Sequence, residues 1–138
     1  MTMQLDPTRP IYLQLMEEIK RRTVRGEYAP GSQIPSVRDM AKEMEVNPNT
    51  IARVYRELER EGFIETHRGQ GSFITDDTGR IKKERTTLGR AATGRFLSDI
   101  GELALTGDQV REILMLIERA LIGEKVNSGK KTNEKNAD

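Results

Sequence analysis

The chain has 138 residues, of which 35% are hydrophobic and 33% are charged, and its net charge is +1. Soluble domains average roughly 45 to 50% apolar and about 25% charged residues, so a small core built from amphipathic helices suits this composition. Because the sequence has no Cys and a single His, it excludes disulfides, thiolate metal sites and multi-histidine metal sites. Most nucleophilic and acid–base enzyme chemistry is excluded with them, and no cofactor or metal is expected.

The hydropathy of the chain limits where the protein can be located. No apolar run approaches the ~18 to 20 residues of a membrane span, and residues 1–6 lack the features of a signal peptide. We therefore expect a soluble, cytoplasmic protein without membrane contact.

Residues 1–77 contain 11 Lys and Arg against 13 Asp and Glu. A nucleic-acid surface would therefore depend on where the basic residues lie, because bulk charge does not favour one.

The first predicted helix begins near Pro10, because proline is pre-organised for a first helical turn. Apolar residues follow at i, i+4 and i+8, namely Ile11, Leu15 and Ile19. Tyr12 lies beside this stripe and is expected in the core. The helix should end before Gly26, and the residues from Pro30 to Pro35 should form an ordered connection.

Two further helices are predicted in quick succession. Ser36 has the form of an N-cap, with Asp39 three residues later, and opens a short helix. Asn47 and Pro48 supply an N-cap and a first helical position for the next helix. The apolar residues of that helix recur at i, i+3, i+4 and i+7 before Gly62: Ile51, Val54, Tyr55 and Leu58. The sequence thus predicts a helix-turn-helix.

A two-stranded wing is predicted after Gly62. Residues 63–67 and 72–75 are β-prone, and the intervening Arg68-Gly69-Gln70-Gly71 has glycines that suit the positive φ angles of a hairpin turn. The polar residues from Asp76 to Gly79 mark the end of this unit. The predicted fold class is therefore mainly α with a small β-hairpin wing.

Two more helices are predicted towards the C-terminus. One starts at about Lys83, although Gly89, Gly94 and Gly101 weaken it by roughly 1 kcal/mol each. Thr106 and Gln109 form a capping box for the last helix. We therefore expect a winged helix-turn-helix DNA-binding domain at residues 1–77, a two-helix dimerisation segment at 78–122 and a disordered polar tail at 123–138.

The apolar residues of the last two helices form a stripe too wide for one neighbouring helix to cover. Intramolecular packing is the alternative, but the width favours a partner surface. We expect a homodimer, with these residues in its interface: Phe96, Ile100, Leu103, Ile113, Leu114, Ile117 and Leu121.

The third predicted helix has the features of a DNA-reading helix. With its apolar face on the core, it leaves amide, hydroxyl and guanidinium groups near the opposite side, where they can reach a major groove. The expected contacts are Asn49, Thr50, Arg53 and Arg56, joined by Arg38 from the second helix and by Arg68, Gly69 and Gln70 from the wing tip.

Each arginine also has an alternative interpretation as a solvated or ion-paired surface residue. This alternative is strongest for Arg56, because Glu59 and Arg60 lie within i+3 and i+4 and allow pairing along the helix surface. His67, next to the wing turn, is either a phosphate contact or pH-sensitive group, or an ordinary exposed strand residue.

The sequence resembles the GntR family of bacterial transcription regulators over most of residues 10–75. The matching motifs are Tyr12-Leu13-Gln14-Leu15, the run from Gly31 to Ala41, the run from Val46 to Glu59, and Glu61-Gly62-Phe63-Ile64 leading into Arg68-Gly69-Gln70-Gly71-Ser72-Phe73. Asn47-Pro48-Asn49-Thr50 and the short C-terminal segment resemble the YtrA-like branch.

The resemblance implies DNA contacts at Arg38, Asn49, Thr50, Arg53, Arg68 and Gly69, and a dimer interface in the C-terminal helices. Many relatives have Arg or another polar residue where this chain has Pro48, so one base-reading position is missing.

We expect a sequence-specific DNA-binding transcription regulator, acting as a repressor, that binds an inverted-repeat operator in double-stranded DNA as a homodimer. A winged-helix protein-interaction module without specific DNA binding is the alternative, because the fold alone does not set the function. No recognised catalytic motif is present, so the protein is not expected to be an enzyme. The sequence identifies neither the operator nor a small-molecule effector.

Overall fold

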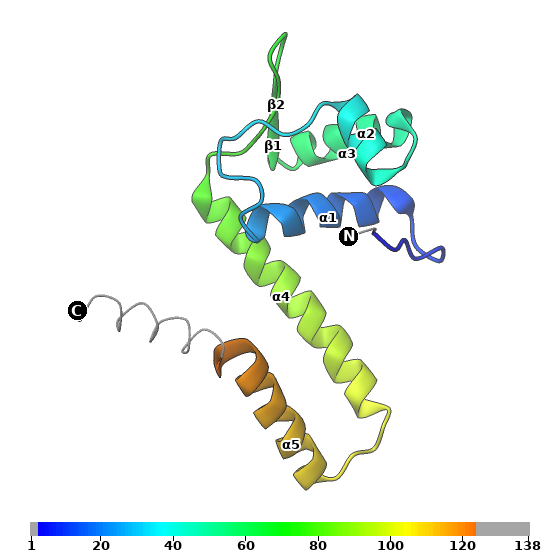
Figure 1. Cartoon of the computed structure of the whole chain (residues 1–138), viewed down its shortest axis with the longest axis vertical. Helices are drawn as coiled ribbons and strands as arrows, with labels where there is room; N and C mark the ends of the chain where they lie inside the picture. Colours follow the sequence, from blue (N-terminus) through cyan, green and yellow to red (C-terminus); the bar gives the residue numbers. More distant parts are fainter. Residues whose placement is uncertain (1–2, 124–138) are drawn as a thin grey trace, which may run out of the picture. The chain divides into compact units, whose positions relative to one another are not determined.

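The computed structural model describes residues 3–123, which form helices and one β-hairpin (Figure 1). The chain divides between Ala92 and Thr93 into two compact units. The expected fold class, mainly α with a small wing, is confirmed. The tail expected at 123–138 lies outside the described residues, apart from Gly123. No helix in the described range has the length and hydropathy needed to cross a membrane.

Three helices form the base of the first unit: α1 (Ile11–Val24), α2 (Val37–Met44) and α3 (Pro48–Arg60). Both predicted N-caps are confirmed. The Ser36 hydroxyl accepts a hydrogen bond from the Asp39 N–H at 3.1 Å, and the Asn47 side chain accepts one from the Asn49 N–H at 2.8 Å. These bonds satisfy N–H groups that a helix start leaves without a partner, so α2 and α3 begin at positions set by local sequence.

The core lies between these helices and the hairpin. The apolar stripes of α1 and α3 meet here, as their spacing predicts, and the fully buried side chains include Leu15, Ile19, Met40, Ile51, Leu58 and Phe63. Tyr12 departs from the expectation, because it is only half-buried and lies at the edge of this core.

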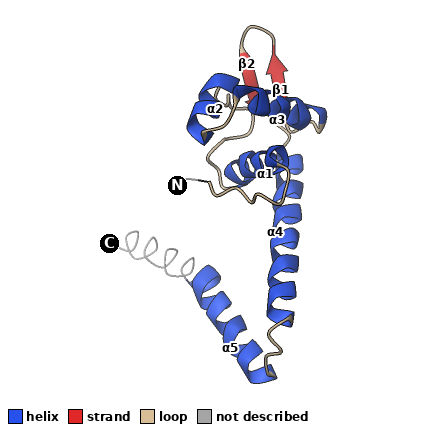
Figure 2. Ribbon diagram, turned by 90° about the vertical axis from the view of Figure 1, so that its right-hand side faces the viewer, coloured by secondary structure: helices blue, strands red, loops and turns tan. Residues whose placement is uncertain are grey.

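The wing consists of β1 (Ile64–His67) and β2 (Gly71–Ile74), paired antiparallel with His67 opposite Gly71. At its tip Gly69 and Gly71 have φ angles of 79° and 115°, in the region that favours glycine. The hairpin extends beyond α2 and α3 on the side away from α1 (Figure 2). It therefore projects from the same side of the unit as the helix-turn-helix.

Helix α4 (Thr78–Gly101) begins earlier than the sequence suggested. The Asp77 carboxylate accepts a hydrogen bond from the Arg80 N–H at 3.2 Å, as an N-cap does, and Ile81 is buried in the core. The first turns of α4 are tied to the unit because the Arg80 guanidinium donates to the Glu61 carbonyl and the Arg85 guanidinium to the Val24 carbonyl. An aspartate directly before Thr78 was the signal for this earlier start.

The second unit contains the end of α4, helix α5 (Gly107–Glu118) and the π-helical turn Arg119–Gly123. The predicted capping box is confirmed: Thr106 and Gln109 exchange hydrogen bonds between side chain and backbone at 2.9 and 3.2 Å. Leu103 lies in the turn after α4 and not in the helix as expected. No described residue after Ile81 is buried.

Candidate nucleic-acid interface

The outward face of α3 follows from its core face. Because the apolar residues of the helix point into the core, Asn49, Arg53 and Arg56 are exposed, and Thr50 is half-buried near the helix start. These polar groups share the side of the helix that faces away from the core. The expected placement of these residues is therefore confirmed, and the helix has a polar surface suited to insertion into a major groove.

The wing tip presents a second set of expected contact residues. Arg68, Gly69 and Gln70 form the turn between β1 and β2, and all three are exposed. Arg38, the second residue of α2, is also exposed. Within the described range, no hydrogen bond or ion pair links Arg38 to α3 or to the wing. Three separate elements thus supply the expected contacts.

The connection before α2 links the wing to the helix-turn-helix. Its backbone pairs with β2 through bonds of 2.9 Å from the Ile34 N–H to the Ser72 carbonyl and from the Ile74 N–H to the Ser32 carbonyl. At its end, the Pro35 carbonyl accepts a hydrogen bond from the hydroxyl of Tyr55 in α3 at 2.7 Å. The wing and α3 are therefore positioned by the same short segment.

Gln33 in this segment was not among the residues expected to matter. Its side-chain amide donates a hydrogen bond of 2.8 Å to the Gln70 carbonyl at the wing tip. A Cβ atom at Gly71 would lie 2.6 Å from the same amide nitrogen, so a side chain there would force the Gln33 amide to move. Gln33 acts over 37 residues of sequence separation, and no local pattern indicated it.

Two sets of arginines in the first unit differ in whether they are ion-paired. Arg9, Arg22 and Arg25, in or beside α1, each have a carboxylate oxygen at 2.7 to 2.9 Å. Within the described part of the chain, Arg38, Arg56 and Arg68 make no ion pair or hydrogen bond. These three arginines of the helix-turn-helix and the wing therefore remain available to phosphate groups, although residues 1–77 contain more acidic than basic residues.

Arg53 differs from these three arginines. Its guanidinium carbon lies 3.8 Å from the centroid of the Tyr12 ring, a cation–π contact between α3 and α1. Sequence reasoning missed this contact because it assigned Tyr12 to the core.

The alternative interpretation of Arg56, pairing along the helix surface, is not what the structure shows. The ion pair that forms there joins Arg60 to Glu57. The Arg60 side chain lowers the pKa of the Glu57 carboxyl by donating a hydrogen bond to it. Arg56 remains exposed and free for another partner.

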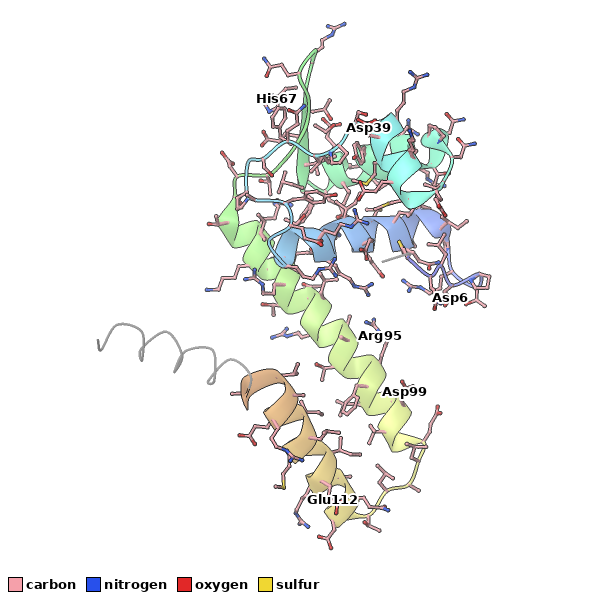
Figure 3. The ribbon with its side chains drawn as sticks, in the orientation of Figure 1. Asp6, Asp39, His67, Arg95, Asp99 and Glu112 are labelled. Carbon is pink, nitrogen blue, oxygen red and sulfur yellow. The ribbon has the colours of Figure 1, made fainter. Side chains whose placement is uncertain are left out.

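His67 lies on the wing, and Asp39 lies near the start of α2 (Figure 3). The His67 ring is exposed and meets the Phe73 ring edge-on, with centroids 4.9 Å apart. Its Nε2 atom is 3.5 Å from a Glu65 carboxylate oxygen. These neighbours fit an ordinary exposed strand residue.

The candidate interface is convex. A wide concave region of about 1210 Å³ lies elsewhere, against α1, and none of the expected DNA contacts lines it. Much of its lining consists of arginines and glutamates that pair with one another, such as Arg22 with Glu18 and Glu43. A projecting helix and a projecting hairpin suit a grooved partner such as duplex DNA better than a small ligand.

Comparisons with known sequences identify the family of the chain. The family model for bacterial regulatory proteins, gntR family, matches residues 11–74. The HTH-type transcriptional repressor YtrA of Bacillus subtilis is 44% identical over 127 residues, which cover 90% of this chain and 98% of YtrA. The uncharacterized HTH-type transcriptional regulator YhcF of the same organism is 43% identical over 109 residues, 79% of this chain and 90% of YhcF.

A solved structure supports the same family assignment. The GntR family transcriptional regulator from Listeria monocytogenes superimposes with a TM-score of 0.71 at 34% identity, covering 80% of this chain and 97% of that one. The agreement extends well beyond the residues of the family model. The chain therefore belongs to the GntR family, in its YtrA-like branch, and is a DNA-binding transcription regulator and not an enzyme.

Proposed function

We propose that this protein is a sequence-specific repressor that binds an inverted-repeat operator as a homodimer. The observation that carries the proposal is the set of unpaired arginines on the projecting side of the winged helix-turn-helix. Free guanidinium groups can replace the counterions of DNA phosphates without first breaking an ion pair in the protein. Repression is proposed because YtrA, which matches nearly the whole chain, is named a repressor.

The proposed DNA contacts are those expected from the sequence. In α3, Asn49 and Thr50 lie in the first turn, from which residues of a recognition helix reach base edges. Arg38 and Arg68, on separate elements, are proposed to bind phosphates on either side of the groove. The complete proposed set is Arg38, Asn49, Thr50, Arg53, Arg56, Arg68, Gly69 and Gln70.

The proposed dimer interface lies in the second unit. Large apolar side chains there are unusually exposed in a single chain: Leu103 is 63%, Leu114 58% and Leu121 64% exposed. A contiguous apolar surface of this kind is a liability in a soluble protein unless a partner covers it. A second copy, related by two-fold symmetry, would supply the cover and present two recognition helices to two half-sites. The other proposed interface residues are Phe96, Ile100, Ile113 and Ile117.

Selection of duplexes from a randomised library tests sequence-specific binding. We expect the full chain to enrich an inverted repeat, with half-sites about one helical turn or a multiple of it apart. Placed over a promoter, the enriched site should lower transcription in a purified system when the protein is added. An unenriched library, or an enriched single half-site, would contradict the proposal.

Sedimentation of a charge-bearing variant tests the homodimer. The double substitution Leu114→Glu and Leu121→Glu places charges in the proposed interface and should yield a monomer that binds the inverted repeat much more weakly, since the two half-sites are no longer coupled. Glu112→Lys, at an exposed position outside the proposed interface residues, is the control and should remain dimeric. A wild-type monomer, or a double variant that still dimerises, would rule out this interface.

A further inference from the structure

The contact between Arg53 and Tyr12 gives Arg53 a role different from that of its neighbours in α3. The guanidinium carbon is 3.8 Å from the ring centroid, which places the cation in van der Waals contact with the ring face. Arg53 is exposed, whereas Tyr12 is half-buried in α1 and packs against the core. The Tyr12 ring is therefore fixed by the core, and it restrains the Arg53 guanidinium.

Stacking restrains the guanidinium without using its hydrogen-bond donors. The N–H groups of arginine lie in the guanidinium plane, so a ring against one face leaves them free. Within the described residues, Arg53 makes no hydrogen bond and no ion pair. Glu57, four residues further along the same helix, is paired with Arg60. Arg53 thus keeps its donors available in one orientation.

The side of α3 on which Tyr12 holds Arg53 indicates a contact with the DNA backbone. A helix with its side chains is about 10 to 12 Å across, and the major groove is about 12 Å wide, so a helix in the groove nearly fills it. Side chains on the outward face meet base edges on the groove floor, and side chains drawn to a flank meet the phosphates of the wall. Tyr12 draws Arg53 to the α1 flank of α3, in the second helical turn.

We propose that Tyr12 is a positioning residue that holds Arg53 as a phosphate clamp, so that base reading falls to Asn49, Thr50 and Arg56. The inference rests on the DNA-binding function proposed above. Restraining a long side chain before binding reduces the entropy lost when it contacts DNA. Arg53 then contributes to affinity for every sequence, and Tyr12 acts only through Arg53.

A double-substitution cycle in the full chain tests this coupling. Binding of a mixed-sequence duplex and of the library-selected duplex is measured over a range of salt for wild type, Tyr12→Leu, Arg53→Ala and the double variant. We expect Tyr12→Leu to weaken binding about two- to fivefold on both duplexes, the range of an exposed cation–π contact. The same change in the Arg53→Ala background should have no effect. Arg53→Ala should lower the salt slope by about one.

Tyr12→Phe is the matched control, because it keeps the aromatic face and removes only the hydroxyl. It should bind both duplexes as wild type does. A second measurement does not depend on Tyr12→Leu folding well: in the free protein, the Arg53 side-chain protons should show an upfield ring-current shift in wild type and Tyr12→Phe. Arg53→Lys, which keeps the charge without the planar group, should bind more weakly than wild type.

The outcomes separate the alternatives. If Tyr12→Leu weakens binding equally with and without Arg53, Tyr12 has only a structural role and the inference is wrong. A loss in Arg53→Ala confined to the selected duplex would make Arg53 a base reader and also overturn it. If the library yields no enriched sequence, the sequence-specific function fails instead, while binding of the mixed-sequence duplex still measures the coupling between Tyr12 and Arg53.

Discussion

The two units of this chain use apolar residues in opposite ways. In the first unit, side chains such as Leu15, Ile51 and Leu58 are fully buried, and the polar groups of the candidate interface are held on a rigid base. In the second, helices with well-formed ends leave Leu103, Leu114 and Leu121 more than half exposed. Helix formation alone therefore does not make a core. The first unit has the burial needed to fold and present side chains accurately, whereas the large apolar side chains of the second unit remain exposed within one chain.

Replacing one leucine in each unit by alanine tests this difference in burial most directly. Leu58→Ala removes a fully buried side chain and should lower the free energy of unfolding by about 2 to 5 kcal/mol. Leu97→Ala removes a side chain that is 62% exposed and should change it by less than about 0.5 kcal/mol. Chemical denaturation of the two variants measures both values. Similar losses would mean that Leu97 is buried, either in a core of the second unit or against a partner.

Shortened chains locate the end of the first unit. A chain ending at Ala92 keeps Ile81, which is 6% exposed, and the contacts of Arg80 and Arg85. A chain ending at Asp77 loses them and should be less stable by about 1.5 to 3 kcal/mol, the contribution of one buried aliphatic side chain. Thermal unfolding of the two chains provides the comparison. Equal stability would place the boundary at the polar turn before α4.

Two glycine substitutions in the wing turn test whether the hydrogen bond between Gln33 and Gln70 stabilises the first unit. Gly69 and Gly71 both have positive φ angles, so alanine strains the backbone at either position. Only at Gly71 would the new Cβ displace the Gln33 amide and break its hydrogen bond to Gln70. Gly71→Ala should therefore cost about 1 kcal/mol more than Gly69→Ala in chemical denaturation. Identical losses would show that the Gln33 contact contributes nothing.

The smallest expected effect concerns pH and the surface of α3. The hydrogen bond from Arg60 lowers the pKa of Glu57, so the ionised pair stabilises the fold above the pKa of the unfolded chain. This contribution is lost as the pH falls through the lowered pKa. Wild type should therefore have a slightly higher melting temperature than Glu57→Gln at neutral pH, and the difference should shrink as the pH falls through the lowered pKa. A constant difference across this range would assign the effect to something other than the ion pair.

Much of the secondary structure was predictable because its signals are local. Ser36, Asn47 and Thr106 cap helices through hydrogen bonds to residues two or three positions away, so their spacing in sequence is enough to identify them. The apolar periodicities of α1 and α3 indicated which faces are buried. The exposed position of Arg56 followed from the apolar face of α3, and that of Arg68 from the predicted hairpin turn.

Contacts between distant segments could not be predicted in this way. Gln33 reaches Gln70 only because the connection before α2 pairs with β2, and Tyr12 supports Arg53 only because α1 packs beside α3. The start of α4 has a local signal in Asp77, but the burial of its first turn depends on space in the core for Ile81. Local hydrogen bonding and periodicity determine where helices begin and which face is apolar. Only the packing of those helices decides which polar side chains meet.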